Sequence, residues 1–224
     1  MKNTFIVIHI YNEEKMIESV IKNVMKQGYR NIIAVDDGST DNTYNIIQKK
    51  KVVSLRHMIN RGKGAAVKTG IEAAKVLNAD YVVTIDGDGQ HDPTDITKIV
   101  NHLDDGNDIV LGNRFTLNQN KIPIFNKIGN IIANLFTYFI YGLSVKDSQS
   151  GFRGYNKKAL GLIQTKLDRY EFDSEVIREI KKHNLRWSEV PIKVYYTTYS
   201  KEKKQRQNFT HGIETILKIV LSGS

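Results

Sequence analysis

Short apolar runs alternate with stretches of helical periodicity over the first half of the chain. β-Branched and aromatic residues predict strands at residues 5–10, 31–35, 52–55, 81–85 and 108–112. Between these runs, apolar residues recur at the spacing of a helix, as at Ile17, Val20, Ile21 and Val24. The alternating order predicts an α/β fold, a mostly parallel Rossmann-like sheet with helices on both faces.

Carboxylates follow three of the predicted strands, at the point where each strand ends. Glu13 comes after the first strand, Asp36 and Asp37 end the second, and Asp86 and Asp88 follow the run at 81–85. Parallel strands place their carboxyl ends at one edge of a sheet. These acids therefore predict an active site at that rim.

The segment Asp86-Gly87-Asp88-Gly89-Gln90 carries the most specific chemistry. Asp86 and Asp88 are two residues apart, so in an extended backbone both side chains point to one side. Two carboxylates this close repel each other unless a cation lies between them, and oxygen ligands suit Mg²⁺ or Mn²⁺. Gly87 leaves room for a ligand, and Gly89 lets the chain turn. A metal–diphosphate site is the first interpretation, and a plain Asp-Gly turn is the alternative.

A second glycine-rich segment, Arg61-Gly62-Lys63-Gly64, precedes a predicted helix at 65–77. Its spacing matches neither a P-loop nor a dinucleotide-binding fingerprint. A helix N-terminus with glycine and lysine can hold phosphate, so Lys63 is either a phosphate ligand or a solvated turn residue.

The second half of the chain has a different pattern. Residues 128–145 contain no charged residue, but Asn130, Asn134 and Gly142 interrupt the apolar run. The pattern predicts an amphipathic helix, at about 121–145, that lies on a membrane surface or covers the sheet as a core helix. A second amphipathic helix is predicted within 208–224. Between them, a polar loop is expected at 147–155, a helix with an acidic, capping first turn from Glu171, and a last strand at 187–196.

Composition limits the class of protein and its partners. The 224 residues fit a single domain, 1–224, and the absence of cysteine fits a cytoplasmic setting. The net charge of +9 implies an anionic partner: nucleic acid, an anionic membrane surface or a phosphorylated substrate. The N-terminal sequence lacks a signal-peptide pattern, and no transmembrane segment is predicted.

Five motifs stand in an order that resembles a known family. The motifs are Tyr11-Asn12-Glu13-Glu14, Asp36-Asp37-Gly38-Ser39, Asp86-Gly87-Asp88-Gly89-Gln90-His91, Gly112-Asn113-Arg114-Phe115 and Ser150-Gly151-Phe152-Arg153. In these motifs the chain is similar to family 2 glycosyltransferases, specifically to the group of dolichol-phosphate mannosyltransferases and polyprenol-phosphate glycosyltransferases. The resemblance departs at His9, where the family usually has proline, and at Tyr195 and Thr198, where it has arginine and glycine.

The resemblance implies a GT-A fold and a metal-dependent, inverting transfer of sugar from a UDP- or GDP-sugar to a polyprenyl (dolichyl) phosphate. The enzyme would be peripheral at the cytoplasmic face of a membrane. The catalytic residues would be Asp88 and Arg114, the metal ligands Asp86, Asp88 and Gln90, and the acceptor-phosphate ligands Arg114 and Lys127. The nucleotide-sugar would be bound by Tyr11, Glu13, Asp37, Asp86, Gly87, Asp88, Gln90, Arg114 and Lys201.

Chemistry and charge define two further expectations. The acceptor is a phosphate monoester with a second pKa of about 6, so it is ionised at neutral pH and no side chain is needed as catalytic base. The alternatives are a sugar-phosphate nucleotidyltransferase and, on charge alone, a basic nucleic-acid-binding module around 201–206. No nucleic-acid partner is expected for the glycosyltransferase.

Overall fold

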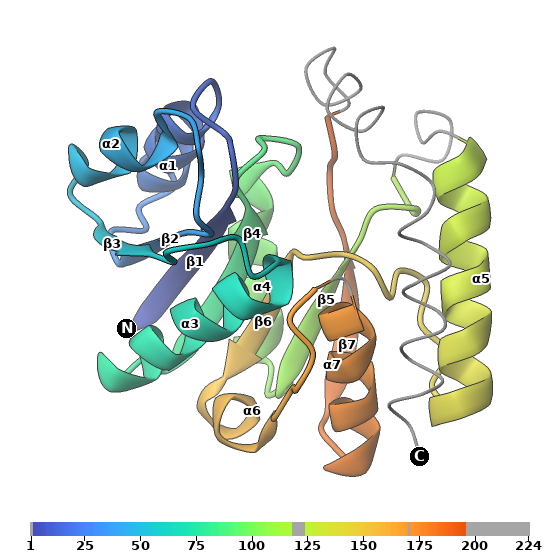
Figure 1. Ribbon diagram of the computed structural model, residues 1–224. Coiled ribbons are helices and arrows are strands. Elements are labelled where there is room, and N and C mark those ends of the chain that lie inside the picture. Colours follow the sequence, from blue (N-terminus) through green and yellow to red (C-terminus); the bar gives the residue numbers. More distant parts are fainter. Residues whose placement is uncertain (1, 118–123, 170, 196–224) are drawn as a thin grey trace.

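The computed structural model describes residues 2–117, 124–169 and 171–195. Within these ranges, seven strands form one sheet in the order β3-β2-β1-β4-β6-β5-β7 (Figure 1). The strands are β1 Thr4–Ile10, β2 Ile32–Asp36, β3 Val53–Arg56, β4 Tyr81–Asp86, β5 Ile109–Asn113, β6 Arg153–Asn156 and β7 Trp187–Pro191. All neighbouring pairs are parallel except those of β6.

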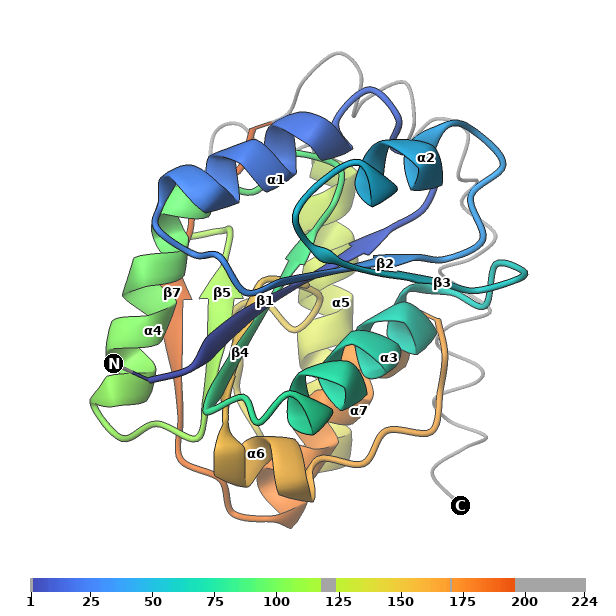
Figure 2. The ribbon, with the colours of Figure 1, turned by 90° about the vertical axis from the view of Figure 1, so that its left-hand side faces the viewer.

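Helices cover both faces of the sheet, as the alternating pattern predicts (Figure 2). Helices α1, α2 and α4 pack on one face, and α3, α6 and α7 pack on the other. The helices are α1 Ile17–Lys26, α2 Thr43–Gln48, α3 Lys63–Val76, α4 Ile96–Asp104, α5 Ile124–Tyr141, α6 Lys157–Leu162 and α7 Glu171–Lys182, with a 3₁₀ turn, η1, at Pro93–Asp95.

Helix α1 illustrates how the sequence specifies these elements. Four of its apolar residues, from Ile17 to Val24, are the ones that the helical spacing selects, and all four are buried. Each such side chain contributes about 1.5–3 kcal/mol when it leaves water. The helix ends at Lys26, and Gly28 follows with a φ of 90°, the left-handed conformation that glycine adopts after a helix.

The parallel pairing of the first strands brings the predicted rim together. In the register of β1 with its neighbours, Ile10 lies opposite Asp36 of β2, and His9 lies opposite Asp86 of β4. The carboxyl ends of β2, β1 and β4 are therefore adjacent. The prediction that Glu13, Asp37 and Asp86 follow strands at one edge is confirmed.

Strand β6 corrects the predicted polar loop. Residues 153–156 form an antiparallel strand between β4 and β5, so these two parallel strands are not neighbours. The sequence does not predict this strand because Arg153 is a charged residue. In the fold the Arg153 side chain is fully buried and paired with Asp173. The last strand also ends earlier than predicted, at Pro191.

Helix α5 lies at one side of the molecule and contacts α7 (Figure 1). Several of its large apolar side chains are exposed, among them Ile131 at 63% and Phe139 at 76%. The helix therefore exposes an apolar side, as predicted for an amphipathic helix. Among the described residues, no helix combines the length and apolar character needed to cross a membrane. The helix predicted within 208–224 lies outside the described residues.

Candidate active site

Asp37 is held by the chain that follows β3. Its carboxylate accepts hydrogen bonds from the backbone amides of Arg61 (3.0 Å) and Gly62 (2.7 Å), and lies 2.7 Å from Nδ1 of His57. Gly62 has a φ of 108°, which favours glycine, and this turn aims the two amides at the carboxylate. Asp37 therefore fixes the position of residues 57–62 beside the carboxyl end of β2. Direct contact between Asp37 and a nucleotide stays a prediction.

The first motif forms a tight turn beside this segment. Asn12 adopts a φ of 53°, and its backbone amide donates to Ser39 Oγ at 2.9 Å. The backbone amide of Glu13 donates to Thr43 Oγ1 at 2.8 Å, and the Glu13 side chain is buried. Tyr11 remains 38% exposed, so its ring is accessible to a ligand at the rim.

Asp86, at the end of β4, lies among basic side chains. One of its oxygens is 3.4 Å from Nε2 of His9, and the other is 3.3 Å from Nε2 of His91. A Cβ atom added to Gly151 would lie 2.3 Å from Asp86 Oδ1 and 2.7 Å from Lys63 Nζ, so the carboxylate and the ammonium border the same space. Burial alone would raise the pKa of Asp86, but Lys63, His9 and His91 hold it well below its usual value.

Lys63 belongs to a buried network of charges. Its ammonium is 2.8 Å from Asp173 Oδ2, and Asp173 Oδ1 is 3.3 Å from the Arg153 guanidinium. Burial lowers the pKa of Lys63, but Asp173 and Asp86 outweigh this effect and raise it above its usual value. The solvated-turn alternative for Lys63 is thus wrong, and Asp173 pairs with two cations rather than capping helix α7.

Asp88 and Gln90 lie in the turn after β4. Asp88 accepts hydrogen bonds from the backbone amide of Gln90 at 2.9 Å and from its side-chain Nε2 at 2.8 Å. Since β4 ends at Asp86, the argument that an extended backbone directs both acids to one side does not apply. Gly89 turns with a φ of 72°, as expected. Gly87 instead packs on β1, where a Cβ would lie 2.9 Å from Ile10, so it does not leave room for a ligand.

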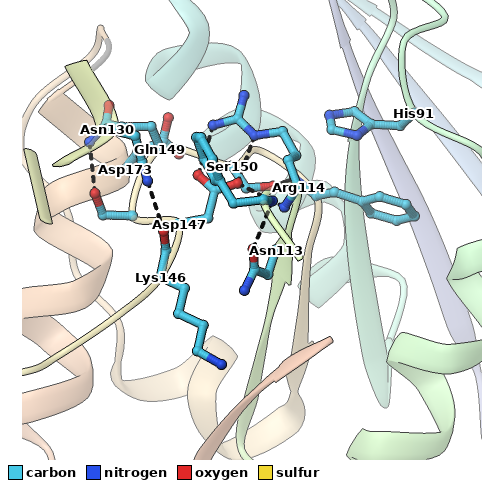
Figure 3. Close-up of polar contacts among 12 residues, drawn as sticks. His91, Asn113, Arg114, Asn130, Lys146, Asp147, Gln149, Ser150 and Asp173 are labelled. Atoms are coloured by element: carbon cyan, nitrogen blue, oxygen red, sulfur yellow. Dashed lines mark hydrogen bonds and ion pairs between the residues drawn. The ribbon is translucent and has the colours of Figure 1, made fainter. Parts of the chain in front are cut away.

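Arg114 follows β5 and is clamped by an acid that the sequence did not single out. The Asp147 carboxylate accepts hydrogen bonds from the backbone amide (3.0 Å), Nε (2.7 Å) and Nη2 (2.7 Å) of Arg114 (Figure 3). Asp147 is 1% exposed, whereas the Arg114 side chain is 21% exposed. The buried acid therefore orients an arginine that remains accessible. Lys127 lies in the first turn of α5 with its side chain outside the described part, as is all of Lys201.

The rim provides a limited set of metal ligands. Within the described ranges, no three His, Cys, Asp or Glu side chains form a group that could hold a metal ion. Asp86 Oδ1 is buried and, among the described atoms, accepts no hydrogen bond. This oxygen, which has the ion pair with His9 but no hydrogen bond, lies close in sequence to Asp88 and Gln90. Together they suit Mg²⁺ or Mn²⁺, which proteins bind through one or two carboxylates while substrate phosphates supply other ligands.

The mostly parallel sheet with helices on both faces is a GT-A-like fold. The fold matches glucosyl-3-phosphoglycerate synthase from Mycobacterium tuberculosis, solved with Mn²⁺, UDP and phosphoglyceric acid, at a TM-score of 0.72 and 17% identity over 97% of this chain and 78% of that chain. Residues 5–163 match the Glycosyl transferase family 2 model, and the chain belongs to this family. The resemblance seen in the motifs is confirmed. Family membership decides against the nucleotidyltransferase, and residues 201–206, the basis of the nucleic-acid alternative, lie outside the described residues.

Two relatives are similar over nearly the whole chain. One is the Uncharacterized protein MJ1222 of Methanocaldococcus jannaschii, 42% identical over 97% of this chain and 90% of the relative. Another is the UDP-N-acetylglucosamine–dolichyl-phosphate N-acetylglucosaminyltransferase of Methanococcus voltae, 39% identical over 89% of this chain and 88% of the relative.

Proposed function

We propose that this enzyme transfers a sugar from a UDP-sugar to a polyprenyl (dolichyl) phosphate. The observation that carries the proposal is the accessible Arg114, oriented by a buried acid at the same edge of the sheet as Asp86 and Asp88. The relative from Methanococcus voltae, whose name gives UDP-N-acetylglucosamine and dolichyl phosphate, supports this donor and acceptor. N-Acetylglucosamine is therefore the first sugar to test, and GDP-sugars are the alternative donors.

The donor would bind across the ends of β2, β1 and β4. Tyr11 offers an exposed ring for a base, and the segment fixed by Asp37 forms the neighbouring wall. Asp86, Asp88 and Gln90 would hold Mg²⁺ or Mn²⁺ against the diphosphate. When bound, the ion neutralises negative charge on the departing nucleoside diphosphate.

The acceptor phosphate would contact Arg114, and Lys127 is a further predicted contact. A guanidinium matches the spacing of two phosphate oxygens, so Arg114 can align one oxygen for attack on the anomeric carbon. The bond from that carbon to the diphosphate breaks as the new bond forms, and in-line attack inverts the configuration. The buried acids Asp147 and Asp173 are each paired with a cation, which favours a mechanism without a catalytic base.

The lipid acceptor requires contact with a membrane surface. Helix α5 exposes Ile131, Leu135 and Phe139, an apolar stripe one turn apart along the helix. The net charge of +9 favours an anionic surface. We place this stripe at the cytoplasmic face of a membrane, with the enzyme bound peripherally.

A transfer assay on the full chain tests the proposal. UDP-N-acetylglucosamine, geranylgeranyl phosphate and Mn²⁺ should yield a lipid-phosphate-linked sugar, and Asp88→Ala should abolish it. The control is Asp105→Ala, an exposed acid after α4, which should leave the rate unchanged. Near-normal turnover by Asp88→Ala would contradict the assigned site.

Thermal shift separates the donors. UDP with Mn²⁺ should raise the melting temperature more than GDP with Mn²⁺, because a ligand at 100 times its Kd stabilises the fold by about 2.7 kcal/mol. A larger shift with GDP would reassign the donor without changing the site.

A further inference from the structure

Two asparagines interrupt the apolar sequence of α5, and both contact one backbone carbonyl. The side-chain amides of Asn130 and Asn134 donate to the carbonyl oxygen of Lys146 at 2.7 and 2.8 Å. The two residues are one turn apart, so they lie on the same side of the helix. Asn134 Oδ1 also accepts from the backbone amide of Ser148 at 3.1 Å. The helix therefore holds the chain on both sides of Asp147.

Strand β7 holds the same segment from another direction. One carboxylate oxygen of Glu189 accepts hydrogen bonds from the backbone amides of Lys146 (2.8 Å) and Asp147 (3.3 Å). The backbone around Asp147 is thus fixed by side chains from α5 and from β7.

The buried position of Asn130 indicates why the helix carries amides here. Asn130 is 6% exposed, and a buried amide is costly unless it is hydrogen-bonded. An apolar residue would serve packing alone. The amides of Asn130 and Asn134 instead donate hydrogen bonds to Lys146, next to Asp147, whose carboxylate holds Arg114.

We propose that Asn130 and Asn134 are positioning residues that set Arg114 for the acceptor phosphate through the Lys146–Ser148 backbone and Asp147. The inference rests on the proposed function, in which Arg114 meets that phosphate. Helix α5 then has a different role on each side. Its exposed apolar stripe contacts the lipid surface, and the side with Asn130 and Asn134 positions Arg114 for the phosphate of the lipid.

The test compares Asn130→Ala/Asn134→Ala with a matched control, Asn107→Ala. Asn107 is also buried and also donates its amide to a backbone carbonyl, that of His102 at 2.7 Å, but it lies before β5 and away from the rim. Both variants lose amide-to-carbonyl hydrogen bonds, so both are expected to lower the melting temperature. A loss of acceptor use beyond the control separates positioning from stability.

Kinetics provide the first readout. With geranylgeranyl phosphate as acceptor, the double variant should lose about tenfold or more in kcat/KM for the acceptor, because a misplacement of about 1 Å can cost up to about 100-fold. Its KM for UDP-N-acetylglucosamine should match that of the wild type, and Asn107→Ala should change neither value by more than about twofold.

Hydrogen exchange provides a readout independent of activity. The backbone amide of Arg114 donates to Asp147, so peptides covering 113–115 and 146–148 should exchange faster in the double variant than in Asn107→Ala. Unchanged exchange at 113–115 overturns the proposal, and so does faster exchange with unaltered acceptor kinetics. If the wild type transfers no sugar while exchange at 113–115 rises, the proposed function fails and the link from α5 to Arg114 stands.

Discussion

Gly151→Ala is the sharpest perturbation of the charged core beneath the rim. The added Cβ would lie 2.3 Å from Asp86 Oδ1 and 2.7 Å from Lys63 Nζ, whereas real Cβ atoms essentially never approach within 3.0 Å. Asp86 Oδ1 and the backbone at residue 151 must therefore move apart by at least 0.7 Å, the difference between 3.0 and 2.3 Å. Lys63 can move its flexible end, but Asp86 is a short side chain at the end of a buried strand.

The expected effect falls on catalysis more than on folding. A shift approaching 1 Å in a group that positions substrate costs up to about 100-fold in rate, so we expect kcat to fall between about 10- and 100-fold. An inserted methyl group in a packed site costs about 1–3 kcal/mol of the free energy of unfolding. The assays are transfer rate at saturating donor, the Mn²⁺ concentration for half-maximal rate, and urea unfolding.

The control is Gly161→Ala in α6, where an added Cβ meets nothing within 4 Å. This variant should keep wild-type kinetics and gain up to about 1 kcal/mol, because alanine is the better helix former. Wild-type kcat and Mn²⁺ dependence in Gly151→Ala would refute the placement of Asp86 in the active site.

Asp147→Asn should lower the free energy of unfolding, measured in urea, by about 2–3 kcal/mol, less than the loss of a fully buried ion pair because Arg114 is partly exposed. The variant should also reduce kcat/KM for the acceptor. An unchanged unfolding curve would contradict the Asp147–Arg114 ion pair. Aspartate at Ile131 and Phe139 should weaken cosedimentation with anionic vesicles by about tenfold or more, and equal binding by this variant argues against α5 as the membrane contact. Burial would raise the pKa of Asp108, but its donors, Lys158 among them, hold it below the usual value. The unfolded chain then binds more protons, so Asp108 stabilises the fold above its unfolded pKa of about 3.9 and loses that contribution in acid. Urea unfolding of Asp108→Asn should accordingly show a weaker loss of stability below that pH.

The sequence predicts the first part of the sheet well for a physical reason. The runs that form β1, β2 and β4 are buried on both faces, so their apolar character is continuous and independent of distant contacts. The rim follows directly from this, because parallel strands must end at one edge. The position of Asp37 and Asp86 could thus be predicted without knowing which side chains they meet.

The partners of these acids could not be predicted in the same way. Lys63 pairs with Asp173, 110 positions away in sequence, and Arg114 pairs with Asp147, 33 positions away. Such pairs form only after the chain has folded, and neither acid differs in sequence from a solvated one. Strand β6 cannot be predicted from the sequence for the same reason, since Arg153 is neutralised by an acid on α7.

The network around Lys63 changes the electrostatic argument for the metal. A pair of acids at a rim predicts a cation between them, but Asp86 already borders the Lys63 ammonium, which Asp173 also shares. A divalent ion beside Asp86 would meet a positive neighbour as well as the carboxylate, so the acids alone provide a weak site. A bound nucleoside diphosphate would supply the additional negative charge that the divalent ion needs at this site. Asp86, Asp88 and Gln90 are therefore expected to hold the ion tightly only together with the nucleotide, and Mn²⁺ without UDP should produce a small thermal shift.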